Sequence, residues 1–174
     1  MKISPPEIIS GNQKGFTLIE LLIGIAIAGI LASGIAMGIF TIFDINARSN
    51  SSMTAVKEVE NAIHWITRDT QMAQQVVLDP GNSGFPIVLS WVDWDSNSHS
   101  VTYSIVSGEL RRIYSLNGDE PTTTVIVNHI DPASLMTNCQ LTPGVLTYTI
   151  TATTGGFRPA SETRSFNIIL RSNP

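Results

Sequence analysis

The chain has 174 residues, a net charge of −4 and 14% charged side chains. Its length allows one domain with its own core, or a small domain with a long appendage. The acidic balance gives no electrostatic support for direct nucleic-acid binding. The single cysteine, Cys139, excludes an internal disulfide, and without a Cys/His cluster beside it we expect a small, half-buried residue.

The first 15 residues form a polar segment with Lys2, Lys14 and two adjacent prolines, and we expect it to be disordered or extended. Residues 21–43 then carry no charged side chain. As a helix this run is about 35 Å long, roughly the hydrocarbon thickness of a bilayer. With lysines before the run and Arg48 after it, the modest positive bias predicts a cytoplasmic N-terminus.

Three interpretations of the apolar run compete. A secretory signal peptide fits the A-x-A spacing of Ala26-Ile27-Ala28, but the run continues for 15 residues after Ala28. A plain signal anchor does not explain Glu20, which stands directly before the run. A carboxylate at this place loses hydration as the helix enters lipid, so it requires a partner.

The third interpretation supplies that partner. Residues 14–22, with the sequence K-G-F-T-L-I-E-L-L, resemble the cleavage and methylation motif of type IV prepilins. The resemblance implies that a membrane peptidase cuts between Gly15 and Phe16 and methylates the new amino terminus of Phe16. It also implies that Glu20 of one subunit pairs with the Phe16 amine of a neighbour during filament assembly.

The same resemblance predicts three regions and a set of partners. Residues 1–15 are a leader peptide, residues 16–43 the transmembrane or filament-core half of a helix, and residues 44–174 an extracytoplasmic head. The partners are other pilin or pseudopilin subunits, a prepilin peptidase/methyltransferase, the inner-membrane assembly platform and the lipid bilayer. After assembly the subunit lies in a periplasmic or cell-surface filament. No cofactor and no direct nucleic-acid contact are expected.

The apolar run contains four glycines: Gly24, Gly29, Gly34 and Gly38. The last two match the small-residue spacing of closely packed membrane helices. Glycine is also common in such helices without a packing role, and the sequence does not separate these two interpretations.

An amphipathic pattern follows the apolar run. Apolar residues repeat at three- and four-residue steps at Val56, Val59, Ile63, Ile66, Thr70, Ala73 and Val77. This stripe predicts one helix from residue 16 to about residue 78, which Asp79-Pro80-Gly81 ends. Its second half should pack on a sheet.

The rest of the chain predicts strands joined by short turns, with a hairpin across Ser107-Gly108. Thr, Val, Ile and Tyr dominate these strands. We expect an α+β fold of pilin type, a long N-terminal helix packed on an antiparallel sheet. The predicted strands are residues 85–91, 100–106, 109–116, 122–128, 145–151 and 165–170, and the predicted turns are 80–84, 117–121, 131–143 and 153–159.

A finer resemblance concerns the head. Four segments are similar to J-type minor pseudopilins of type II secretion and related minor pilins: residues 62–76 with Arg68-Asp69 and Gln74, residues 101–105, residues 108–112 and the closing residues 166–171. The similarity implies a minor subunit that initiates or caps a filament. Protein secretion, DNA uptake and adhesion all remain open as the task of that filament.

One loop has ligand character. Asp93, Asp95 and Asn97 alternate as in the start of an EF-hand, which makes them a weak metal candidate. Ser98 and Ser104 stand where that loop needs glycine and glutamate. A polar turn between two strands is therefore the expected structure, and no metal site is predicted.

The sequence contains no nucleotide-binding, serine-hydrolase or zinc-protease motif. His64, His99 and His129 have no metal spacing, and we expect each to be exposed or half-buried. We therefore expect a protein that is not an enzyme. The alternative function is a membrane-anchored extracytoplasmic binding or sensor protein that does not polymerise.

Overall fold

The structure is a computed structural model that describes residues 15–79 and 83–170. The predicted leader lies outside these residues, except for Gly15. The chain divides into two compact units between Phe43 and Asp44. The described part of the first unit is mainly the beginning of a long helix, and the second unit is an α+β head.

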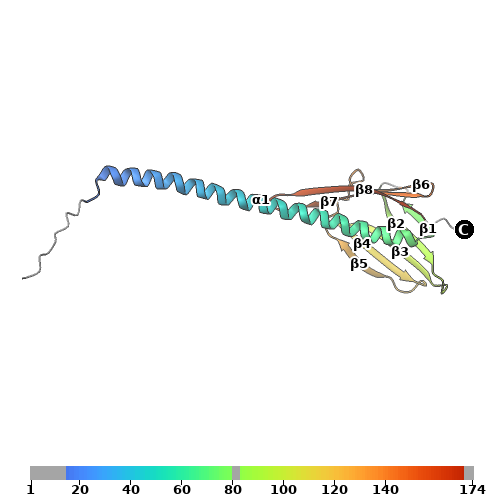
Figure 1. The fold of residues 1–174 in the computed structure, drawn as a ribbon. Helices are drawn as coiled ribbons and strands as arrows, with labels where there is room; N and C mark the ends of the chain where they lie inside the picture. Colours follow the sequence, from blue (N-terminus) through green and yellow to red (C-terminus); the bar gives the residue numbers. More distant parts are fainter. Residues whose placement is uncertain (1–14, 80–82, 171–174) are drawn as a thin grey trace, which may run out of the picture. The chain divides into compact units, whose positions relative to one another are not determined.

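The long helix, α1, extends from Leu18 to Met72 (Figure 1). By length and composition it is apolar enough to cross a membrane. Every described residue up to Phe43 is exposed. This apolar surface therefore needs lipid or other protein chains to remove it from water.

The second half of α1 buries one face in the head, so the amphipathic helix is confirmed, although Val56 and Ile63 of the predicted stripe are only half-buried and Val77 is exposed. The buried residues of this face are Ala55, Val59, Ala62, Ile66, Asp69 and Thr70. The predicted end near residue 78 is wrong, because α1 ends at Met72 and Gln75–Asp79 forms strand β1. The Gln74 N–H donates to the carbonyl of Ser90 at 2.9 Å, so the chain pairs with the sheet instead of continuing the helix. Two adjacent valines in β1 favour this choice.

In the described chain, eight strands follow α1 and form two antiparallel sheets (Figure 1). The first sheet has the order β1-β2-β3-β4-β5, with β2 (Gly84–Val92), β3 (Ser98–Val106), β4 (Glu109–Leu116) and β5 (Thr122–Val127). The second sheet has the order β6-β7-β8, with β6 (Asn138–Thr142), β7 (Val145–Thr154) and β8 (Ala160–Ile169). A long helix followed by antiparallel sheets confirms the α+β pilin-like fold.

The six predicted strands correspond to β2, β3, β4, β5, β7 and β8. The hairpin at Ser107-Gly108 is confirmed, and both turn residues have positive φ, 54° and 81°, as a type I′ turn requires. Strand β6 lies in segment 131–143, which was expected to be a turn. Cys139 in β6 is buried rather than half-buried, and this burial raises the pKa of its thiol to about 12.

The core lies where α1 meets both sheets, so the head is one packed unit. Its fully buried apolar residues include Val59, Ile66, Ile87, Leu89, Val101, Leu110, Leu146 and Ile150. Adjacent helix residues contact different sheets. The Asp69 carboxylate accepts a hydrogen bond from Tyr103 of β3, and the Thr70 hydroxyl bonds that of Tyr148 of β7 at 2.7 Å.

The two sheets also meet directly, at Gly84. This residue has a φ of +79°, and a side-chain carbon there would lie 2.1 Å from the carbonyl oxygen of Cys139 in β6. The Cys139 N–H donates to the carbonyl of Ser83 at 2.6 Å. Glycine alone combines this left-handed backbone with such a close approach.

We expect Gly84→Ala to lower the free energy of unfolding by about 2–4 kcal/mol, because left-handed strain adds to the overlap with β6. Gly118→Ala is the matched control. Its φ is +80°, but nothing lies within 4 Å of the added carbon, so strain alone should cost about 1 kcal/mol. Thermal unfolding of the full chain in detergent measures both. An equal decrease in the free energy of unfolding in Gly84→Ala and Gly118→Ala would contradict a role for the contact with Cys139.

Candidate functional site

The predicted cleavage motif lies at the start of α1. Gly15 and Phe16 precede the helix and are exposed, with Phe16 89% accessible. The Glu20 N–H donates to Oγ1 of Thr17 at 3.3 Å. In return, the N–H and the hydroxyl of Thr17 donate to Oε2 of Glu20 at 3.0 and 2.8 Å. This reciprocal capping box starts the helix after Thr17 and leaves the Gly15–Phe16 peptide bond outside it.

Glu20 therefore also caps the helix of its own chain, a role that was not among the predictions. The signal was present, because Thr-x-x-Glu before an apolar run is the spacing of a capping box. Within the described chain, both hydrogen bonds that this carboxylate accepts go to Oε2. Oε1 can then accept a second donor while the cap stays intact. The pair with the Phe16 amine of another subunit stays a prediction.

The four glycines of the span, Gly24, Gly29, Gly34 and Gly38, all lie on exposed surface. A side-chain carbon added at any of them would have no neighbour within 4 Å. Gly34 and Gly38 stand one turn apart on the same face, so a second helix could approach closely there. Both hydroxyl side chains of residues 21–43 donate to carbonyls of their own helix, so neither donor is left unpaired in an apolar environment. The packing role of the glycines stays a prediction.

The loop that carries the weak metal candidate is a turn between β2 and β3. Asp93 Oδ1 accepts the N–H groups of Asp95 and Asn97, both at 2.9 Å. Its Oδ2 accepts the Asn97 side chain at 3.1 Å and contacts His99 Nε2 at 3.1 Å. The hydrogen bond from His99, and then those from Asn97, lower the pKa of Asp93 to about 2. Among the described residues, no three His, Cys, Asp or Glu side chains are grouped to hold a metal ion.

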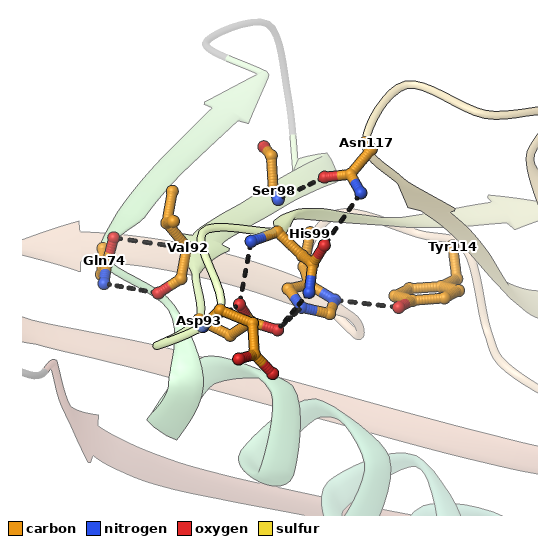
Figure 2. A network of polar contacts seen from close by, with 9 residues as sticks. Gln74, Val92, Asp93, Ser98, His99, Tyr114 and Asn117 are labelled. Carbon is orange, nitrogen blue, oxygen red and sulfur yellow. Dashed lines mark hydrogen bonds and ion pairs between the residues drawn. The ribbon is translucent and has the colours of Figure 1, made fainter.

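His99 joins this turn to the neighbouring strands (Figure 2). Its Nδ1 bonds the Tyr114 hydroxyl of β4 at 2.8 Å, and its ring stacks on Trp91 at a centroid distance of 5.0 Å. In the turn after β4, Asn117 accepts the Ser98 N–H at 2.7 Å. These contacts tie two adjacent turns at one end of the first sheet, so we assign the cluster a structural role.

A second polar cluster lies around Asp69, which is 1% exposed. Its carboxylate accepts the Tyr103 hydroxyl at 2.6 Å and two guanidinium N–H groups of Arg112 at 2.6 and 3.2 Å. The guanidinium of Arg112 lies over the rings of Trp65 and Tyr114 at 5.3 and 5.2 Å. A hollow of about 520 Å³ lies here, lined by Trp65, Arg68, Asp69, Met72, Trp91, His99, Arg112 and Tyr114.

The charges of this cluster depend on one another. Burial, followed by the hydrogen bond and charge of Asp69, raises the pKa of Tyr103, which therefore stays neutral and donates. Burial alone would lower the pKa of Arg112, but the hydrogen bonds and charge of Asp69 outweigh it and raise this pKa. Three donors bond the oxygens of Asp69, so this carboxylate has a structural role. The cluster fastens the end of α1 to β3 and β4.

Comparison with known families singles out the N-terminal region. Residues 10–36 match the family model described as the prokaryotic N-terminal methylation motif. The match supports a type IV pilin-like family and a cleaved, membrane-anchored subunit of type IV pilin or pseudopilin type. It implies assembly with other pilin subunits and processing by prepilin peptidase, and this family is structural rather than enzymatic. No solved structure matches the chain. The finer similarity to J-type pseudopilins concerns other residues and stays a prediction.

Proposed function

We propose that the chain is a minor pilin or pseudopilin, a structural subunit of a type IV pilus-like filament. A prepilin peptidase cleaves it after Gly15 and methylates Phe16. The N-terminus starts in the cytoplasm and the head lies outside the cytoplasmic membrane. The subunit acts in initiation or assembly of a filament for protein secretion, DNA uptake or adhesion, together with an inner-membrane assembly platform.

The observation that carries this proposal is an accessible cleavage motif directly before a capped helix whose residues 18–43 are all exposed. Residues 18–43 present an apolar surface that is exposed at every position of this described segment. Lipid can cover it before assembly, and the helices of neighbouring subunits can replace lipid afterwards. The exposed glycines at residues 34 and 38 suit close approach of such helices.

Cleavage also creates the charge that assembly uses. The new Phe16 amine is positive and stands at the entrance of an apolar segment, where it requires a counter-charge. Two opposite charges 4 Å apart attract by about 4 kcal/mol at an effective dielectric constant of 20. An unpaired amine and an unpaired Glu20 are both costly in lipid, so the pair selects the axial register between subunits.

Mass spectrometry of the protein extracted from membranes tests the processing step. Co-expression with a prepilin peptidase should give a chain that starts at Phe16 and carries one added methyl group there. Gly15→Leu, which places a bulky side chain at the cut bond, should remain uncleaved at a similar membrane level. A wild-type chain that keeps its Met1 terminus in the presence of active peptidase would contradict the proposal and favour a simple membrane anchor.

A further inference from the structure

The loop of residues 155–159, between β7 and β8, has the sequence Gly-Gly-Phe-Arg-Pro. Phe157 is 84% exposed, and the guanidinium of Arg158 lies over its ring at 5.2 Å. Gly156 has a φ of +113°, and an added carbon at either Gly155 or Gly156 would meet nothing within 4 Å. The loop therefore presents an aromatic ring and a cation with little other bulk around them.

Two contacts fix this loop beside the first helical residues of the head. Arg158 Nε donates to Oδ1 of Asp44, and the Thr154 hydroxyl donates to the carbonyl of Ser51 at 3.4 Å. Asp44 directly follows Phe43, the last residue of the uncharged run. Because consecutive Cα atoms are about 3.8 Å apart, the loop contacts a residue that lies one step along the chain from the end of the uncharged run.

The chemistry around this contact fits the boundary between lipid headgroups and acyl chains. Arg158 pairs with Asp44, so the carboxylate is neutralised where it would otherwise repel anionic lipid. Arg48 is exposed and lies one turn after Asp44 on the same face of α1. Ile45, 60% exposed, extends the apolar surface past Asp44. Apolar side chains flanked by arginine are typical of segments that lie in this boundary.

We propose that residues 155–159 form a membrane-contact loop. Phe157 enters the boundary between headgroups and acyl chains, while Arg158 and Arg48 face the phosphates of the bilayer that holds α1. The inference rests on the membrane anchoring within the proposed function, and not on cleavage or polymerisation. A second contact beside the helix restricts rotation of the head, so one side of the head faces incoming subunits before assembly.

Spin-label accessibility in vesicles of phosphatidylethanolamine and phosphatidylglycerol tests the loop on the full chain. Cys139→Ala removes the only cysteine. One label is then placed by Phe157→Cys, by Trp94→Cys or by Ala32→Cys in separate proteins. Trp94 is 92% exposed but lies after β2, whose end contacts Gln74 beyond α1. The helix from residue 44 to residue 72 alone spans about 42 Å, which makes Trp94 the matched exposed aromatic far from the membrane.

The collision rate with oxygen, relative to that with a water-soluble nickel chelate, should be about threefold or more higher at position 157 than at position 94. The label at position 32 should show the highest ratio of oxygen to nickel-chelate collision rates. If the label at 157 is as accessible to water as the label at 94 while the label at 32 lies deep in lipid, the membrane-contact loop is overturned. Membrane anchoring by α1 is then still supported. A water-exposed label at 32 would overturn both. If the collision ratio at position 157 is high only at a high protein-to-lipid ratio, the label contacts a neighbouring chain. This result would also overturn the proposal.

Discussion

Glu20→Gln is expected to reduce incorporation into filaments by about tenfold or more, at an unchanged membrane level and with unchanged cleavage after Gly15. Glutamine can accept the same two hydrogen bonds from Thr17, so the helix cap is kept and the charge alone is removed. The Phe16 amine of the adjacent subunit then has no counter-charge in an apolar environment. Quantitative immunoblotting of sheared filaments, at matched membrane levels in a host with the other filament components, measures the effect.

Thr17→Val separates the two roles of Glu20. It removes the capping hydroxyl at a cost of about 1 kcal/mol for the start of the helix but keeps the carboxylate charged. Incorporation should stay within about twofold of the parent protein, since the apolar environment stabilises the rest of the helix. If Thr17→Val and Glu20→Gln are excluded from filaments to the same extent, the cap and not the charge controls assembly.

The second large effect is expected in the head. Asp69→Asn should lower the free energy of unfolding by about 3–5 kcal/mol, because the largely buried guanidinium of Arg112 loses its counter-charge while the side-chain volume is kept. The loss should lower Tm by roughly 10 °C or more in a head of this size. Thermal unfolding of the full chain in detergent, followed by tryptophan fluorescence, suits this measurement because Trp65 lies against Arg112.

Glu109→Gln provides the matched control for the buried pair. Glu109 pairs with Arg111 on the same strand at 2.7 Å, and both side chains are about one-third exposed. A solvent-screened pair of this kind contributes at most about 1 kcal/mol. The double variant Asp69→Leu with Arg112→Met should recover part of the stability, because it leaves no buried charge unpaired. Equal Tm losses in Asp69→Asn and Glu109→Gln would contradict a special role for the buried pair.

The two effects concern different steps of one task. In the proposed function, the N-terminal motif governs processing of the chain and its pairing with a neighbour. The Asp69 cluster and the Thr70–Tyr148 contact hold α1 to both sheets of the head. An Asp69 variant should therefore lose stability while its N-terminus is still cleaved, and a Glu20 variant should keep its Tm while it fails to assemble.

Several elements could be predicted from the sequence because their causes are local. The absence of charge over residues 21–43 requires an apolar environment whatever the rest of the chain does. The hairpin at Ser107-Gly108 follows from a Ser-Gly pair, a dipeptide that marks turns, between alternating strands. The cleavage motif is a contiguous run, and residues 10–36 match a known motif for the same reason. The capping box was equally local and could have been found from Thr17 and Glu20.

Other features depend on contacts between distant residues. The end of α1 at Met72 is decided by the pairing of β1 with β2, since the apolar stripe continues into Val77 without interruption. Strand β6 has five residues and becomes a strand because β7 offers it a partner. The hydrogen bonds that Asp69 accepts come from residues 34 and 43 positions away.

The sequence alone therefore determined that this protein has an apolar helix with a processing motif in front and an α+β head behind. Short-range periodicity, charge and motif spacing are properties of neighbouring residues, so they can be recognised without knowledge of the tertiary structure. Only the tertiary structure decided how the strands divide into two sheets and which polar groups are buried together. It also decided that residues 155–159 lie beside Asp44. These facts arise when segments far apart in the chain exclude water from one another.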